Sequence, residues 1–157
     1  AELERRIADA GLSSTRLSEL VELRSGEARG TEVHRDRWRV VLVDGVGLLA
    51  SIYRAGSIAY VGGGFTTGVH NVMEPAVCGL PVLFGPRHSN AVEAGLLIER
   101  GGGRAVEDVA AFRRELAGLF DDDEHRRRAG SQAARLVEDQ AGATERSVEL
   151  LAPYLSR

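Results

Sequence analysis

Residues 57–84 read SIAYVGGGFTTGVHNVMEPAVCGLPVLF. The apolar run that ends at Val61 predicts a strand, and the glycines that follow it predict a loop in which the backbone approaches another group closely. A short helix is expected over about residues 74–78, and residues 81–84 predict the next strand. This order, with short connections, predicts parallel strands joined by a helical crossover.

The same alternation of strands and helices continues on both sides of this stretch. The β-branched run at residues 38–43 predicts a strand buried on both faces. Residues 46–54 predict a helix whose inward side chains are Leu48, Leu49, Ile52 and Tyr53. Further helices are expected over residues 2–10, 90–100, 108–119, 123–139 and 141–155, further strands over 12–17 and 104–106, and a loop over 24–37. We therefore predict one α/β domain, 1–157, with an open, doubly wound parallel sheet that binds ligands at the carboxyl ends of its strands.

The composition narrows the class of protein. Hydrophobic residues make up 43% and charged residues 27% of the 157 residues, as in globular domains, so disorder is excluded as the main state. A general nucleic-acid binder is usually basic, and the net charge here is −3, so no nucleic-acid partner is expected. The single cysteine excludes an internal disulfide and a Cys-rich zinc site. No apolar run reaches the roughly 18 residues that a transmembrane helix needs.

The first candidate for a ligand site is the run Gly62, Gly63 and Gly64. It directly follows a predicted strand, so its backbone N–H groups are expected at the ligand edge of the sheet, where several such dipoles can converge on a phosphate. The run does not match the spaced glycines of a dinucleotide-binding motif, and the lysine of a P-loop is absent. The glycines therefore predict phosphate contact without identifying the ligand.

Asn71 and Glu74 follow the glycine run and allow two interpretations. Asn71 as N-cap and Glu74 as the third helical residue would form a capping box. Alternatively, Pro75 occupies the first helical position, which proline favours. Glu74 would then be free at the mouth of the site to accept both hydroxyl hydrogens of a ribose. The residues alone leave both interpretations open.

Other polar residues near these loops are candidates as well. His70 is either a structural histidine bonded to backbone, or a ligand contact or base. Arg87, His88 and Asn90 follow the strand at 81–84. They either form a polar loop in which Asn90 caps the next helix, or recognise the anionic part of a ligand. The 4 histidines of the chain show no metal-ligand spacing, so no metal site is expected.

Several stretches, taken together and in order, resemble the C-terminal half of the 3-deoxy-D-manno-octulosonic acid (Kdo) transferases. They are VLVDGVGLLASIYRAGSIAYVGGGF (41–65), GVHNVMEP (68–75), GLPVLFGP (79–86) and EAGLLIERGGG (93–103). The resemblance extends from about Trp38 to Leu155. It implies the GT-B architecture, in which two Rossmann-like domains face each other across a cleft. The chain would be the C-terminal, Rossmann-like half that binds the donor nucleotide.

The resemblance also implies a ligand and its contacts. The family's donor is CMP-Kdo and its acceptor is a lipid A precursor, in the synthesis of lipopolysaccharide. Nucleotide contacts are implied where the family usually has Met-Gly-Glu and where it has Asn-Pro-Leu-Glu. The corresponding residues here are Val46, Gly47, Leu48, Asn71, Val72, Met73 and Glu74. Gly47, Asn71 and Glu74 match the family, whereas Leu48 replaces its acidic residue.

The family's catalytic acidic residue and its membrane-associating segment belong to the N-terminal domain. We therefore expect this chain to be a soluble, catalytically incomplete fragment of an enzyme at the cytoplasmic face of the bacterial inner membrane. It would reach the acceptor and the membrane only through that other half. The family implies inverting transfer that needs no metal and no cofactor, with CMP-Kdo as a substrate.

Two other hypotheses stay open. One is the UDP-sugar-binding half of another GT-B glycosyltransferase or of an epimerase. The other is a nucleotide-binding domain without catalytic function. The first would differ in its preference for UDP over CMP, and the second in having no partner domain.

Overall fold

The computed structural model describes residues 2–24 and 38–155. The chain divides into two compact units, residues 1–49 and 50–157, and each is described by itself. The loop expected over residues 24–37 lies almost wholly outside the described residues. The prediction of a single domain stays a prediction.

The first unit contains two short parallel strands and two helices. Its elements are α1 (Glu2–Asp9), β1 (Ser14–Arg16), α2 (Leu17–Arg24) and β2 (Val40–Leu42). Strand β1 pairs with β2 in parallel, with Thr15 opposite Val41. Thr15 is buried, and its hydroxyl donates a hydrogen bond to the carboxylate of Glu19 over 2.9 Å, which satisfies the polar group inside the unit.

Two expectations about the segment after residue 37 are wrong. Val41 and Val43 are 46% and 43% exposed, so this strand is not buried on both faces. The reason is that β2 is three residues long and pairs in a sheet of two strands. The next helix, α3 (Leu49–Tyr53), begins three residues later than expected and leaves Leu48 and Leu49 exposed. Gly47 has a φ of 82°, which a right-handed helix cannot contain, so the helix begins after it.

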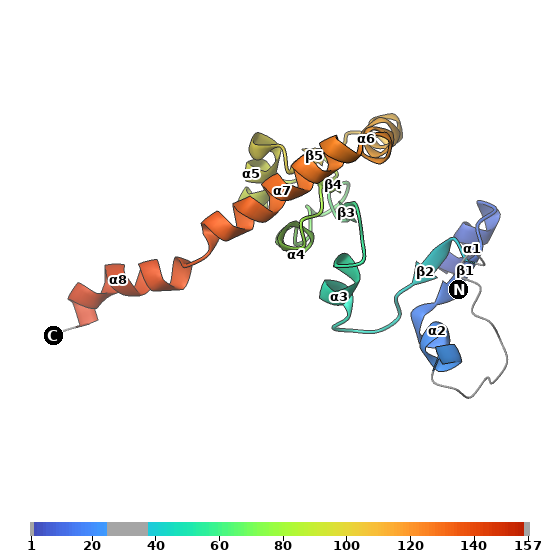
Figure 1. Cartoon of the computed structure of the whole chain (residues 1–157), viewed down its shortest axis with the longest axis horizontal. Helices are drawn as coiled ribbons and strands as arrows, with labels where there is room; N and C mark the ends of the chain where they lie inside the picture. Colours follow the sequence, from blue (N-terminus) through green and yellow to red (C-terminus); the bar gives the residue numbers. More distant parts are fainter. Residues whose placement is uncertain (1, 25–37, 156–157) are drawn as a thin grey trace. The chain divides into compact units, whose positions relative to one another are not determined.

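The second unit is built on a parallel sheet of three strands in the order β3-β4-β5. Chain order and crossovers follow the alternation expected from the sequence (Figure 1). The elements are β3 (Ala59–Val61), α4 (Met73–Val77), β4 (Val82–Phe84), α5 (Val92–Arg100), β5 (Gly103–Ala105), α6 (Val109–Asp121), α7 (Asp123–Gln140) and α8 (Ala143–Leu155). The α/β class and the parallel pairing of the strands are confirmed.

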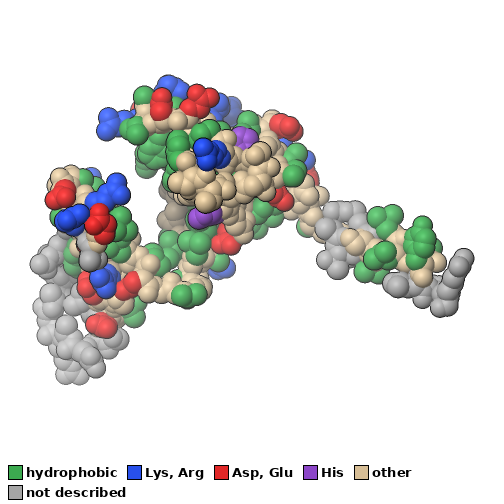
Figure 2. All heavy atoms as spheres, turned by 180° about the vertical axis from the view of Figure 1, so that it is seen from behind, with side chains coloured by type: hydrophobic (Ala, Val, Ile, Leu, Met, Phe, Trp, Pro, Cys, Tyr) green, Lys and Arg blue, Asp and Glu red, His purple; other side chains and the backbone are tan. Residues whose placement is uncertain are grey.

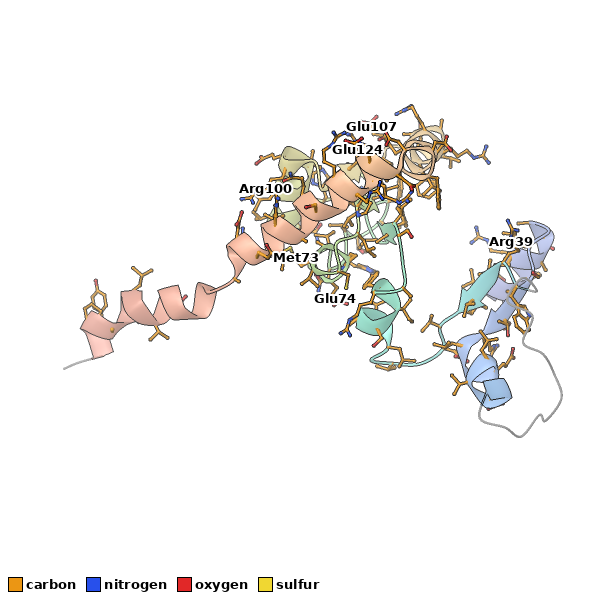
Figure 3. All side chains as sticks on the ribbon, viewed as in Figure 1. Arg39, Met73, Glu74, Arg100, Glu107 and Glu124 are labelled. Carbon is orange, nitrogen blue, oxygen red and sulfur yellow. The ribbon has the colours of Figure 1, made fainter. Side chains whose placement is uncertain are left out.

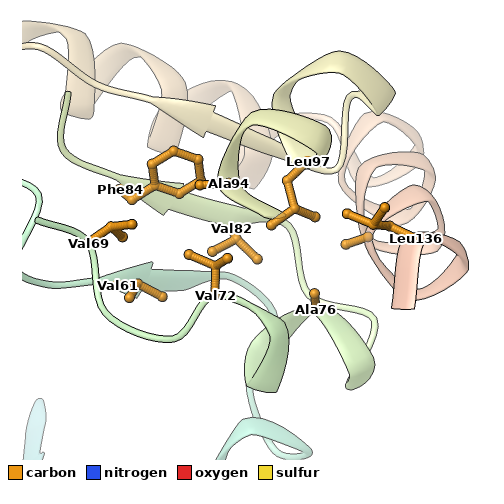
Figure 4. Close-up of a cluster of buried hydrophobic side chains, with 10 residues drawn as sticks. Val61, Val69, Val72, Ala76, Val82, Phe84, Ala94, Leu97 and Leu136 are labelled. Carbon is orange, nitrogen blue, oxygen red and sulfur yellow. The ribbon is translucent and has the colours of Figure 1, made fainter. Parts of the chain in front are cut away.

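Helices cover both faces of this sheet, because the central strand β4 is buried on both sides. Val82 and Phe84 point to one face, where they pack against residues of α4, α5 and α7 (Figure 4). Leu83 points to the other face and packs against Leu119 of α6 and Ala129 of α7. The second unit is therefore doubly wound. The contacts on the first face come from Val61, Val69, Val72, Ala76, Ala94, Leu97, Ala133 and Leu136.

Helix α5 packs against the sheet through Leu97, which is fully buried, and Leu96 is partly buried. Val92, the first residue of the helix, is 75% exposed.

On the face seen in the space-filling view, arginine and acidic side chains of the described residues are interspersed (Figure 2). Among the described residues, no helix combines the length and the apolar composition required to cross a bilayer.

Gly130 marks the close approach of α7 to the turn after α4. A β-carbon on Gly130 would lie 2.0 Å from the carbonyl oxygen of Gly79 and 3.5 Å from Cδ of Pro81. Since the nearest atom belongs to the backbone, room for a methyl group would require a shift of the helix or of the turn. The contact between α4 and α7 therefore depends on glycine at this position.

We predict that Gly130→Ala lowers the free energy of unfolding by about 1–3 kcal/mol, because the methyl group overpacks this contact. Gly118→Ala in α6 is the matched control, since a β-carbon there meets nothing within 4 Å. That substitution should be neutral or stabilise by up to about 1 kcal/mol, the difference in helix propensity. Urea unfolding followed by circular dichroism measures both. Equal stability of the two variants would contradict the close contact.

Candidate functional site

Two loops meet at the carboxyl edge of the three-stranded sheet. One follows β3 and spans residues 62–72, and the other follows β4 and spans residues 85–91. Because β3 and β4 are parallel neighbours, with Val61 opposite Phe84, both loops begin at the same edge. This is the edge at which open parallel sheets bind ligands. We call these segments the glycine loop (62–72) and the arginine loop (85–91).

The two loops touch through their backbones. A β-carbon on Gly64 would lie 2.6 Å from the backbone nitrogen of Gly85, and one on Gly85 would lie 2.6 Å from the carbonyl carbon of Gly64. Beside this contact, the N–H of Arg87 donates to the carbonyl of Gly64 over 2.9 Å. Only glycine at both positions permits such an approach. Gly64 and Gly85 are therefore required for the two loops to pack against each other.

The glycine loop also folds back on itself. The carbonyl of Gly63 accepts hydrogen bonds from the N–H groups of Thr66 (2.8 Å) and Gly68 (3.2 Å), and that of Gly62 accepts one from His70 (3.1 Å). The hydrogen bonds described for Gly62, Gly63 and Gly64 thus all use their carbonyl oxygens as acceptors. A β-carbon on Gly62 would meet nothing within 4 Å, so this residue borders open space.

His70 lies at the same place. A β-carbon on Gly63 would come within 2.8 Å of Cδ2 and 2.9 Å of Nε2 of the imidazole, so the ring lies directly against the loop backbone. Gly63 has a φ of 89° and accommodates this contact without strain. His70 is exposed as a residue, so the structure keeps both the structural and the ligand interpretations open.

The polar side chains of the arginine loop bond to protein groups. The guanidinium of Arg87 donates to the carbonyl of Thr66 over 2.8 Å. The ring of His88 meets Phe84 edge to face, with centroids 5.5 Å apart. Asn90 was expected to cap α5, but the N-cap is Ala91 and has no side-chain hydrogen bond. The amide of Asn90 bonds instead to the backbone of Val69 in the glycine loop.

Asn71 and Glu74 adopt neither of the two expected arrangements. Helix α4 begins at Met73, so Pro75 is its third residue, where the missing N–H costs no bond within the helix. Asn71 Oδ1 accepts from the N–H of Met73 over 2.9 Å, and its Nδ2 donates to Oε1 of Glu74 over 2.9 Å. Glu74 is half-buried at the start of α4, next to Met73 (Figure 3). Asn71 holds its carboxylate, so Glu74 is not free as the second interpretation required.

Tyr53, at the end of α3, is a neighbour of Glu74. The sequence indicated it only as an inward side chain of its helix. Partial burial raises the pKa of the Tyr53 phenol, and the nearby carboxylate of Glu74 and thiol of Cys78 raise it further. Cys78 itself is half-buried. The phenol of Tyr53 therefore lies near the carboxylate of Glu74. No spacing in the sequence connects residues 53 and 74.

An apolar hollow of about 220 Å³ in the second unit was also missed. Its walls include Tyr60 and Phe112, whose rings meet edge to face with centroids 5.4 Å apart, and Phe65 of the glycine loop. The remaining lining residues are Val106, Asp108 and Val109. The sequence contained one signal for this hollow. Side chains alternate along β3, so Tyr60 points to the opposite face of the sheet from Ala59 and Val61.

Val46, Gly47 and Leu48 lie in the first unit, in the turn after β2. Val46 is fully exposed, and a β-carbon on Gly47 would meet nothing within 4 Å. The turn is anchored by Asp44, whose carboxylate accepts from the hydroxyl (2.6 Å) and the N–H (3.1 Å) of Ser18. These bonds lower the pKa of Asp44. The turn is therefore an accessible, anchored backbone segment within its own unit.

Among residues 2–24 and 38–155, no group of three or more His, Cys, Asp or Glu side chains is arranged to hold a metal ion. The candidates that the structure does bring together are all in the second unit. They are Gly62, Gly63, Gly64, His70, Asn71 and Val72 in the glycine loop, Arg87, His88 and Asn90 in the arginine loop, and Met73 and Glu74 at the start of α4.

No family model matches the chain. A 3-deoxy-D-manno-octulosonic acid transferase of Haemophilus influenzae is 33% identical over 129 residues, which are 80% of this chain and 30% of that protein. The enzyme of the same description from Chlamydia pneumoniae is 31% identical over 119 residues, which are 74% of this chain and 27% of that protein. The chain thus spans less than a third of the length of these curated relatives.

A solved structure shares the fold. It is the crystal structure of the C-terminal CMP-Kdo binding domain of WaaA from Acinetobacter baumannii, with a TM-score of 0.71 and 22% identity. The match covers 87% of this chain and 66% of that one. The chain therefore has the α/β fold of this solved domain, and it is a homologue of the 3-deoxy-D-manno-octulosonic acid transferases.

Proposed function

We propose that this chain is the part of a Kdo transferase that binds the donor, CMP-Kdo. The observation that carries the proposal is the similarity to curated Kdo transferases over four fifths of the chain. The shared fold supports it, since the solved domain is described as one that binds CMP-Kdo. The acceptor would be a lipid A precursor in lipopolysaccharide synthesis, and the complete enzyme would work at the cytoplasmic face of the inner membrane.

The loop geometry supports a phosphate site over the glycine loop. The carbonyl oxygens of Gly62 and Gly63 are turned to partners within the loop, and Gly62 borders open space. A phosphate placed there would meet backbone N–H groups, which bind anions at the edges of such sheets. The same groups would stabilise the charge that develops on the phosphate as CMP leaves, because they are oriented before the reaction begins.

Glu74 is the proposed ribose contact. Asn71 holds Oε1 of this carboxylate, which fixes the direction of the side chain. The second carboxylate oxygen would accept a ribose hydroxyl, and Asn71 would act by orienting it. The turn at Val46, Gly47 and Leu48 is proposed to contact the cytosine or the ribose through its backbone, since Leu48 has no charge to contribute.

The proposed reaction is inverting transfer without a metal. The acceptor oxygen forms a bond to the anomeric carbon of Kdo as the bond from that carbon to the phosphate oxygen breaks, and the electron pair leaves with CMP. The acceptor's proton would pass to a base outside this chain. The chain by itself is therefore proposed to be catalytically incomplete, and correct placement of donor and acceptor would come from the complete enzyme.

We predict that Gly62→Ala weakens CMP binding by about tenfold or more while the midpoint of thermal unfolding is kept. The added methyl group meets open space, so it would obstruct only a ligand. Gly95→Ala is the control, because a β-carbon there also meets nothing within 4 Å and lies in α5, away from the loop. Titration calorimetry with the full-length protein measures both. Unchanged affinity in Gly62→Ala would show that the phosphate does not lie over Gly62.

We also predict that Glu74→Gln weakens CMP binding by about 1–3 kcal/mol, the cost of removing a charged hydrogen-bond acceptor. Glutamine keeps the size of the side chain and an oxygen for the amide of Asn71, so the start of α4 should hold. Glu99→Gln, an exposed position of α5, is the control. Calorimetry should include UDP and UMP, because tighter binding of UDP than of CMP would favour a different donor. A Glu74→Gln variant with unaltered affinity would leave this carboxylate only its local role at the helix.

Finally, we predict that the full-length enzyme transfers Kdo in excess EDTA at its normal rate. The histidines are scattered, and no Asp-x-Asp sequence lies near the glycine loop, since Asp121 and Asp123 lie far along the chain. Product is measured by mass spectrometry of the Kdo-modified lipid, with CMP-Kdo generated in place. A large loss of rate that added magnesium or manganese restores would contradict metal independence.

A further inference from the structure

Asn90 of the arginine loop forms two hydrogen bonds with the backbone of one residue of the glycine loop, as a neighbouring strand does in a sheet. Oδ1 of Asn90 accepts from the N–H of Val69 over 3.1 Å, and its Nδ2 donates to the carbonyl of the same residue over 2.9 Å. Val69 is 4% exposed, so both of its backbone polar groups are largely removed from water. The carbonyl of Val69 would lose its partner without Asn90, and leaving a buried carbonyl unpaired costs free energy, so this pairing helps to determine the loop's shape.

The neighbouring glycine makes room for this amide. A β-carbon on Gly68 would lie 2.6 Å from Oδ1 and 3.0 Å from Nδ2 of Asn90, so the amide rests on the backbone of Gly68. The φ of Gly68 is 119°, a value that other residues rarely adopt. The N–H of Gly68 in turn donates to the carbonyl of Gly63 over 3.2 Å. A continuous path of contacts therefore runs from Asn90 to the glycine run.

A second set of bonds to the loop does not involve Asn90. The N–H of Val69 also reaches the carbonyl of Arg87 over 3.0 Å, and the N–H of Arg87 donates to the carbonyl of Gly64 over 2.9 Å. The guanidinium of Arg87 bonds to the carbonyl of Thr66. Removal of the Asn90 amide should therefore loosen residues 68–70 without unfolding the domain.

We infer that Asn90 is a positioning residue for donor binding. Its two amide atoms are engaged by Val69, so it acts on the donor through the glycine loop and not by contact. The inference rests on the proposed function, because it assumes that the phosphate of the donor binds over this loop. A binding loop that is held in shape before the ligand arrives loses less conformational entropy on binding, and so binds more tightly.

The test uses the full-length protein with two substitutions and one control. Asn90→Asp keeps the size and the acceptor but sets a carboxylate oxygen against the carbonyl of Val69. Asn90→Ala removes both bonds and adds no charge, so it separates loosening of the loop from repulsion of the phosphate. Ser89→Ala changes the exposed neighbour in the same loop and serves as the control.

Each variant is followed by hydrogen exchange of the peptide 62–72 without ligand, by calorimetry with CMP, and by the KM for CMP-Kdo. Both Asn90 variants should exchange this peptide about tenfold faster, and bind CMP and CMP-Kdo about tenfold more weakly, as the loss of two partly buried hydrogen bonds allows. Hydrogen exchange of the α6 peptide 109–121 should stay unchanged in both variants. In the control Ser89→Ala, exchange of the peptide 62–72, the affinity for CMP and the KM for CMP-Kdo should all stay unchanged.

Two results would overturn the inference while the unaltered protein binds CMP. Faster exchange with unchanged CMP affinity would show that the loop's shape does not matter for binding. Weaker binding with unchanged exchange in Asn90→Ala would show that Asn90 contacts the donor directly. If the unaltered protein does not bind CMP, the proposed function fails first, and the inference fails with it.

Discussion

The backbone contact between Gly64 and Gly85 is the constraint on which the site depends. It joins the loops that follow two neighbouring parallel strands, and no β-carbon fits at either position. Because the contact is made by backbone atoms, the hydrogen bond from Arg87 to Gly64 and the pairing of Asn90 with Val69 can form around it. The loops behave as one structure at the edge of the sheet, and the candidate ligand groups are arranged on it.

In this arrangement the polar side chains hold the loops in place, and the backbone is left to contact a ligand. Polar side chains of the arginine loop and of Asn71 bond mainly to protein groups, and thereby hold the glycine loop and Glu74 in place. The space beside Gly62 is open, and a ligand bound there would contact the backbone. Successive backbone N–H groups in loops and turns form concavities that bind anions, which is consistent with the proposed phosphate site. The apolar hollow at Tyr60 and Phe112 belongs to the same unit, and the proposed donor site does not use it.

Local patterns predicted most elements of the second unit, and hydrogen bonds made by asparagine side chains account for two errors. The strand at 81–84 and the helices after residue 108 were evident because their apolar periodicity is long or their β-branched runs are compact. The cap of α5 was misassigned because Asn90 has the local chemistry of an N-cap, yet its best partner is a residue 21 positions away. The start of α4 was misplaced for a local reason, since Asn71 bonds to the N–H of Met73 and to the carboxylate of Glu74 from just outside the helix.

The amino-acid sequence by itself determined the α/β class, the order of strands and helices, the place of the glycine loop after β3, and the relationship to the Kdo transferases. These follow from residue periodicity, from glycine's freedom of backbone conformation, and from an ordered set of motifs. Only the tertiary structure decided that Asn90 pairs with Val69, that Tyr53 lies near Glu74, and that β2 stays partly exposed. The physical reason is that a hydrogen bond or a buried face depends on which distant segments the fold brings within a few ångströms, and local sequence carries no record of that distance.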